Sequence, residues 1–159
     1  MKKRIDPFKS IRPPELSVSQ TGDWLTFRGM AFQAVFDTQA GTLHSLDYGH
    51  GQLLEHPLKP VIRFADLTPD LRLARVLRSH EGDCHCLTCF YKASKILGHL
   101  ICRFQIDANG AIAIEAAVRP RKPLIAFDLD EGYEKDQPLP AGQIHKLSAC
   151  ITRPASQVV

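Results

Sequence analysis

The feature that most constrains this chain is its alternation of apolar and polar residues in short segments. Turn residues separate these segments about every 8 to 12 positions. Successive side chains of an extended strand point to opposite faces, so alternation gives each segment one apolar face. From Glu15 onward the sequence therefore predicts an all-β protein with the fold of an antiparallel β-sandwich.

The clearest predicted hairpin is LICRFQIDANGAIAIEAAV, residues 100–118. Asn109 and Gly110 form a dipeptide typical of tight turns, and an alternating segment lies on each side of it. We expect Glu115 to lie on the outward face. The residues expected to face the core are Cys102, Phe104, Ile106, Ile112, Ile114, Ala116 and Val118.

Other segments predict further strands with less regular patterns. Residues 32–36 place three apolar side chains on one face, and Asp37 to Gly41 supply a turn with a glycine suited to positive φ. Strict alternation after this turn would put Leu43 and Leu46 on opposite faces. The segments LIAFDLD and QIHKLSACITR also alternate, and the polar loop EGYEKDQPLPAG joins them.

Residues 69–82, PDLRLARVLRSHEG, fit two periods. Leu71, Ala74 and Leu77 recur at a helical spacing, whereas Leu71 and Leu73 fit a strand. We predict a short helix or turn that leads into a strand.

Length and charge limit how the chain can be organised. Its 159 residues are 44% hydrophobic, which is enough for one domain at 15–159, preceded by a basic, proline-bearing tail or linker at 1–14. The net charge of +3 is spread along the chain without a basic stripe, so we expect no nucleic-acid partner. We expect no membrane association and a cytoplasmic location, because no apolar run reaches the ~18 residues of a span and none follows the basic start.

The segment GDCHCLTCFYK, residues 82–92, gathers three of the five cysteines. A thiolate metal site would need a tight turn between Cys86 and Cys89, where the sequence has neither glycine nor proline. In a strand, Cys84 and Cys86 share one face and Cys89 lies on the other. We therefore expect reduced thiols that fill space, with no metal and no cofactor.

The histidines near this cluster would complete a metal site only under the alternative conformation. His80 and His85 could join the cysteines if the strand were abandoned. The metal site remains the alternative to a strand at these residues.

Two stretches carry a resemblance to a known family. The first, residues 14–70, contains the double hairpin FDTQAGTLHSLDYGHGQLLEHPL, and the second, residues 91–130, contains the hairpin at Asn109. Their order and spacing resemble the small-chain domain of the large β-galactosidases of glycoside hydrolase family 2. The resemblance implies the N-terminal half of a supersandwich like that of galactose mutarotases, here truncated.

The resemblance also implies candidate carbohydrate contacts. The loop FADLTPD, residues 64–70, corresponds to a family loop beside the active site, although it keeps only Ala65 and Asp70 of the expected types. Sugar binding also needs aromatic rings for stacking. The predicted carbohydrate-binding residues are Arg63, Asp66, Asp70, Trp24 and Tyr48.

The expected function is accessory rather than catalytic. In the family the two catalytic carboxylates come from a separate barrel domain, for which this chain has no room, so we expect no catalytic residue here. The expected partners are a galactoside, a second copy of the chain or a larger glycosidase chain. The alternative is a small enzyme of the aldose epimerase type, with a histidine as general acid and a carboxylate as base. The histidines available for it are His44, His50, His56, His99 and His145.

Overall fold

The computed structural model describes residues 16–129 and 138–152, and all regular secondary structure in this part of the chain is β-strand. The predicted all-β fold is therefore confirmed, while the tail predicted at 1–14 lies outside the described residues. The strands are β1 (Ser17–Thr21), β2 (Trp24–Arg28), β3 (Gln33–Asp37), β4 (Thr42–Asp47), β5 (Val61–Arg63), β6 (Leu73–Glu81), β7 (Cys84–Tyr91), β8 (His99–Ile106), β9 (Ile112–Arg119), β10 (Ala126–Asp128) and β11 (His145–Ile151).

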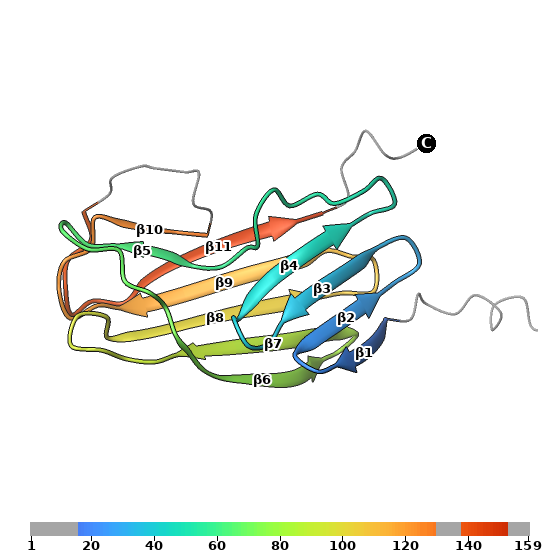
Figure 1. The fold of residues 1–159 in the computed structure, drawn as a ribbon, viewed down its shortest axis with the longest axis horizontal. Helices are drawn as coiled ribbons and strands as arrows, with labels where there is room; N and C mark the ends of the chain where they lie inside the picture. Colours follow the sequence, from blue (N-terminus) through green and yellow to red (C-terminus); the bar gives the residue numbers. More distant parts are fainter. Residues whose placement is uncertain (1–15, 130–137, 153–159) are drawn as a thin grey trace, which may run out of the picture.

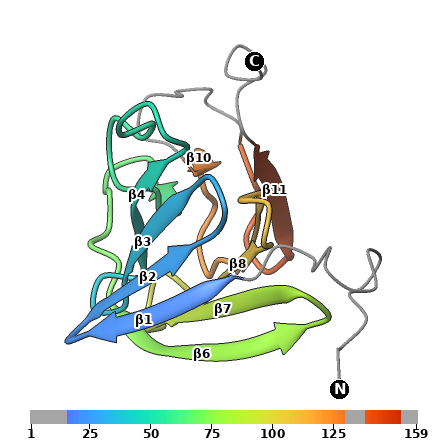
Figure 2. The ribbon, with the colours of Figure 1, turned by 90° about the vertical axis from the view of Figure 1, so that its right-hand side faces the viewer.

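The strands form three antiparallel sheets in a sandwich-like arrangement. A four-stranded sheet has the order β1-β2-β3-β4, a five-stranded sheet has the order β11-β9-β8-β7-β6, and β10 pairs with β5. The four-stranded sheet faces the five-stranded one (Figure 1), and Figure 2 shows β10 in the opening between β4 and β11. At the opposite margin β1 meets β6, where Arg78 donates a hydrogen bond to Gln20.

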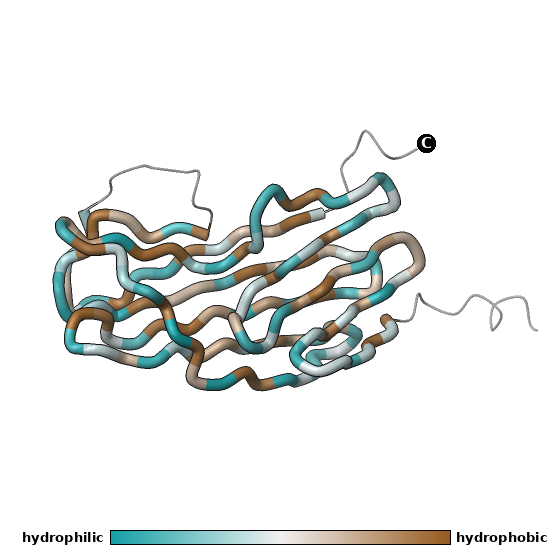
Figure 3. Tube along the Cα trace, viewed as in Figure 1, coloured by the Kyte–Doolittle hydropathy of each residue, from teal (hydrophilic) through white to brown (hydrophobic). Residues whose placement is uncertain are grey.

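The core lies between these layers and consists of the apolar faces that alternation predicted. Figure 3 shows apolar and polar residues alternating along the strands. The Phe36 and Phe104 rings pack edge to face with centroids 5.1 Å apart, joining β3 to β8. Every residue that the 100–118 hairpin was expected to bury is buried, and Glu115 is exposed. The predicted hairpin is confirmed.

A β-bulge in β4 overturns the expectation that Leu43 and Leu46 lie on opposite faces. Phe36 pairs with Leu43, whereas the residue before Phe36 pairs with Ser45. His44 is therefore an extra residue on β4, and it shifts the alternation by one position. As a result both leucines are fully buried, and the exposed His44 side chain lies outside the core.

The strand predicted within 69–82 is confirmed as β6, Leu73–Glu81, but no helix precedes it in the described residues 69–72. Leu73 pairs with Tyr91 and Arg75 pairs with the preceding residue of β7, so the register shifts at Ala74. This bulge lets Leu73 and Val76, three positions apart, both pack against the core. A spacing of three also occurs in helices, but here the edge of β7 supplies a ladder of backbone partners.

Two tyrosine hydroxyls connect the layers in opposite directions. Tyr48, which follows β4, donates to the carbonyl of Gly110 in the β8–β9 turn at 2.6 Å. Tyr91, at the end of β7, donates to the carbonyl of Gly41 in the β3–β4 turn at 3.1 Å. Gly41 has φ of +71°, as its turn was expected to require. Each layer thus bonds to a turn of the other.

We predict that Tyr48→Phe and Tyr91→Phe each lower the free energy of unfolding by about 1 kcal/mol, because each leaves a buried acceptor without its hydroxyl donor. Urea denaturation followed by circular dichroism measures this change. Thr38→Ala is the control, because Thr38 makes an exposed hydrogen bond that water can replace. Equal destabilisation by all three variants would contradict the role of the two tyrosine hydroxyls in holding the layers together.

Candidate functional site

Strand β7 places its three cysteines on two faces, as predicted. Cys89 lies in the core, whereas Cys86 lies on the outer face and its Sγ accepts a hydrogen bond from Arg103 at 3.5 Å. Cys102 lies directly opposite Cys89 on β8. Burial raises the pKa of Cys89 to about 12, and burial followed by the nearby Cys89 raises the pKa of Cys102 as well. These two thiols therefore stay protonated at neutral pH and pack as apolar groups.

His80 and His85, which were expected to join the cysteines in a metal site only if the strand were abandoned, meet each other across an intact strand pair. They are directly opposite each other across the β6–β7 pair, with ring centroids 4.1 Å apart. His85 also packs edge to face on Phe27. Burial, and then the charges of His80 and Arg78, lower the pKa of His85, which favours its neutral form. Among the described residues, three or more metal-ligating side chains do not gather at any point.

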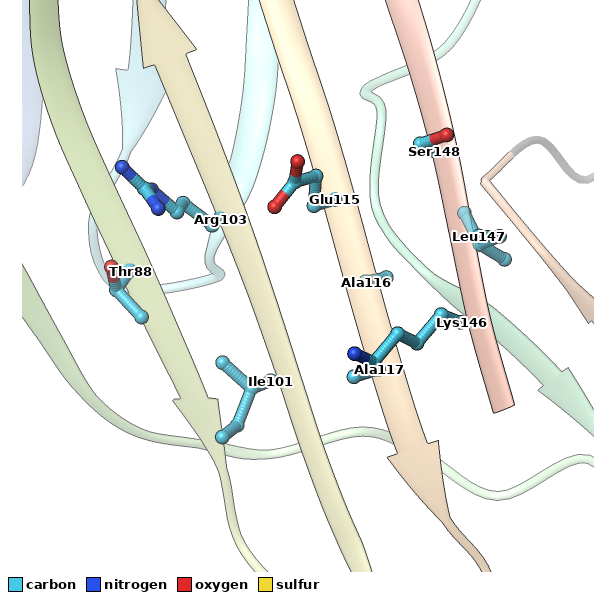
Figure 4. A pocket seen from close by; sticks show the side chains of 9 residues that line it. All are labelled: Thr88, Ile101, Arg103, Glu115, Ala116, Ala117, Lys146, Leu147 and Ser148. Carbon is cyan, nitrogen blue, oxygen red and sulfur yellow. The ribbon is translucent and has the colours of Figure 1, made fainter. Parts of the chain in front are cut away.

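The outer face of the five-stranded sheet carries a hollow of about 510 Å³. Arg103 on β8 and Glu115 on β9 are direct cross-strand neighbours, and Figure 4 shows them side by side with Lys146 of β11 farther along. Arg103 also pairs with Glu81 of β6. The hydrogen bond to the Cys86 sulfur, and then the bond to Glu81, raise the pKa of the Arg103 guanidinium. The floor of this hollow is thus a charged network.

Apolar side chains surround this network on the same outer face. Ile101 and Leu77 are exposed, and Ile144, just before β11, is 61% exposed. Phe90 is half-buried, with the guanidinium of Arg75 over its ring at 4.5 Å. The outer face therefore combines charged side chains with exposed apolar area.

The five predicted carbohydrate-binding residues lie on several elements. Tyr48 is only 4% exposed and holds the β8–β9 turn, whereas Trp24 on β2 is 41% exposed. Arg63 on β5 is half-buried, and Asp66 and Asp70 are exposed. The hollow beside Asp70 contains none of the other four residues. Their role in sugar binding remains a prediction.

A polar hollow of about 300 Å³ lies beside Trp24, and sequence reasoning missed it. Trp24 is directly opposite Asp37 across β2 and β3, and its ring contacts the His44 ring with centroids 4.8 Å apart. The residues that line this hollow are Asp37, Ala40, Thr42, His44, His56, Pro57 and Lys59. Sequence reasoning had named Trp24, His44 and His56 for separate functions and had placed Asp37 at a turn. It could not bring them together, because the bulge that exposes His44 has no signature of its own.

Asp37 and His145 have structural partners as well. The Asp37 Oδ1 atom accepts hydrogen bonds from the backbone N–H groups of Gln39 at 2.9 Å and Ala40 at 3.2 Å, which closes the turn. His44 and Asp37 line one hollow, whereas the His145 Nε2 atom lies 2.7 Å from the carbonyl oxygen of Pro140. His44, like His56, therefore shares a hollow with the Asp37 carboxylate.

Comparison with known proteins leaves the family open. No protein-family model matches the chain, and no curated protein matches it. The structure shows an all-β protein of antiparallel sheets, and the resemblance to the β-galactosidase small-chain domain rests on the residue pattern. In the described part of the chain no helix has the length and apolar character needed to span a membrane.

We predict that a thiol reagent such as dithionitrobenzoate, which releases a yellow product, reacts quickly with the exposed Cys150 in the native protein and more slowly with the half-buried Cys84. The buried Cys86, Cys89 and Cys102 react only after denaturation, because reaction needs an accessible thiolate. Cys150→Ser removes the fast phase. If Cys84 is protected from the reagent and a chelator removes this protection, the result favours a metal site at the cysteines instead.

Proposed function

We propose that this chain is a non-catalytic, carbohydrate-associated β-sandwich module, similar to the small-chain domain of β-galactosidase. In this proposal it packs against a glycoside hydrolase chain or a second copy of itself. The observation that carries the proposal is the uncovered edge and outer face of the five-stranded sheet at β11.

The exposure of β11 supports a partner at this edge. One side of β11 pairs with β9, and among the described strands none pairs with its other side. Even on the face that it turns toward the core, Leu147 and Ile151 are only partly buried, and Ala149 is exposed. Unpaired backbone groups beside partly buried apolar side chains are what an added strand or chain covers.

The opposite edge of the same sheet, strand β6, is less suited to pairing with an added strand. β6 carries Arg75, Arg78 and Glu81 and begins with a bulge, and both features discourage pairing with another strand. The last five residues of β11, 147–151, contain no charged side chain. Of the two edges of this sheet, β11 is therefore the better surface for association.

The carbohydrate part of the proposal rests on Trp24 and the hollow beside it. A sugar ring stacks on an exposed aromatic side chain and bonds to a few fixed polar groups. Trp24 supplies the ring, while Asp37, His44 and Lys59 supply charged or polar groups near it. This arrangement supports sugar binding without requiring bond cleavage.

We predict that the chain forms a dimer at high concentration, as measured by size-exclusion chromatography with light scattering. Ala149→Lys adds a charge to the uncovered edge and shifts the protein to monomer, and circular dichroism verifies that the variant is folded. Ser19→Lys on the polar edge strand β1 is the matched control and leaves the dimer intact. A wild-type monomer at every concentration counts against self-association through β11.

A second candidate function is the aldose epimerase reaction, and one observation favours it. Asp37, His44 and His56 line the same hollow, so a carboxylate and a histidine acid face one volume. If this function holds, the protein accelerates exchange between the α and β anomers of galactose in an NMR exchange experiment. His44→Gln would abolish the acceleration, and His145→Gln would not. The accessory function predicts no acceleration by any of these proteins.

A further inference from the structure

Three separate segments meet at one end of the five-stranded sheet around a second hollow, of about 450 Å³. They are the start of β8, the end of β9 with the residues after it, and the turn before β11. The residues that line the hollow are Gly98, His99, Arg119, Pro120, Arg121, Ala141 and Gly142. We call it the 98/119/142 hollow.

Backbone contacts hold the walls of this hollow together. The N–H of Arg121 donates to the carbonyl of Ile96 at 3.1 Å, and the N–H of Gly142 donates to the carbonyl of Pro120 at 2.9 Å. A Cβ atom at Gly98 would overlap the carbonyl oxygen of Arg119, so only glycine permits this approach of the two segments. The hollow is therefore formed by the fold and not by loose side chains.

The charges around the 98/119/142 hollow have one sign. His99 and Arg119 are direct cross-strand neighbours, and Arg121 lies against Gly98 on the same rim. Neither aspartate nor glutamate lines the hollow. The Arg119 Nε group donates to the Gly142 carbonyl at 3.3 Å, which orients its guanidinium and leaves its terminal N–H groups for a ligand. Arg119 and Arg121 therefore place two guanidinium groups on one rim, where they attract a bound anion.

A smaller apolar hollow adjoins the cationic one. It measures about 220 Å³, and His99 and Arg119 line both hollows. Its other walls are Ile101, Ala117, Val118 and Ile144. A ligand that reaches both volumes therefore combines an anionic group with a less polar body.

We propose that the 98/119/142 hollow binds the phosphate group of a small phosphorylated molecule, a site independent of the accessory function proposed above. The planar guanidinium groups of Arg119 and Arg121 match the oxygens of a phosphate in pairs. Gly98 and Gly142 carry no side chain that would keep a phosphate from these groups. The adjoining apolar hollow then receives the organic part of the molecule.

Titration calorimetry of the 159-residue chain tests the site with phenyl phosphate, galactose 6-phosphate and inorganic phosphate, at constant ionic strength. Phenol and galactose are the uncharged controls. The phosphorylated probes bind and the uncharged ones do not. A monoester that binds at least about tenfold more tightly than inorganic phosphate identifies an ester as the ligand, and equal affinities identify free phosphate.

Arginine variants locate the binding. Arg121→Gln weakens phosphate binding by at least about tenfold, and Arg121→Lys weakens it less, because lysine keeps the charge but loses the paired donors. Arg28 lies on the four-stranded sheet, so Arg28→Gln makes the same change in net charge far from the hollow and leaves the phosphate affinity unchanged. Circular dichroism verifies that each variant is folded. Equal weakening by Arg28→Gln and Arg121→Gln, unchanged affinity in Arg121→Gln, or no binding of any phosphate would overturn the site.

Discussion

Burial of one apolar face of each strand between two layers determines where the other side chains of this protein lie. The contact between Phe36 and Phe104 lies at the centre of this arrangement, and the hydroxyls of Tyr48 and Tyr91 hold the layers together near their turns. Because inward positions are filled at high density, a polar side chain must point outward or find a partner. The chemistry of the chain is therefore distributed over its outer faces, edges and strand ends.

This constraint explains why the most reactive-looking segment is structural. The thiols of Cys89 and Cys102 are enclosed by the core, and on the other face of β7 the Cys86 sulfur lies under Arg103. The outward faces gather different groups. One hollow joins Asp37 to His44 beside Trp24, and another places Arg119 and Arg121 around two glycines. The first suits a sugar, and the second suits an anion.

Sequence reasoning succeeded where a strand keeps strict alternation and failed where a bulge interrupts it. The hairpin around Asn109 has two regular strands, so its buried residues could be read directly from the sequence. In β4 and β6 one extra residue changes the face of all residues after it, at His44 and at Ala74. The contact of His80 with His85 was missed for a related reason, because cross-strand neighbours depend on register. Trp24 and His44 were named as candidates for different functions, but their meeting beside Asp37 was not predicted.

By itself the sequence determined that this protein is built of antiparallel strands, which residues of the regular strands are buried, and that the cysteines of β7 are divided between two faces. These properties follow from local periodicity, because neighbouring side chains of a strand alternate wherever the strand lies. Only the tertiary structure decided the uncovered edge at β11, the hollow beside Trp24 and the convergence of Gly98, Arg119 and Gly142. Such sites join residues from distant segments, and their meeting depends on strand order and register, which no local pattern specifies.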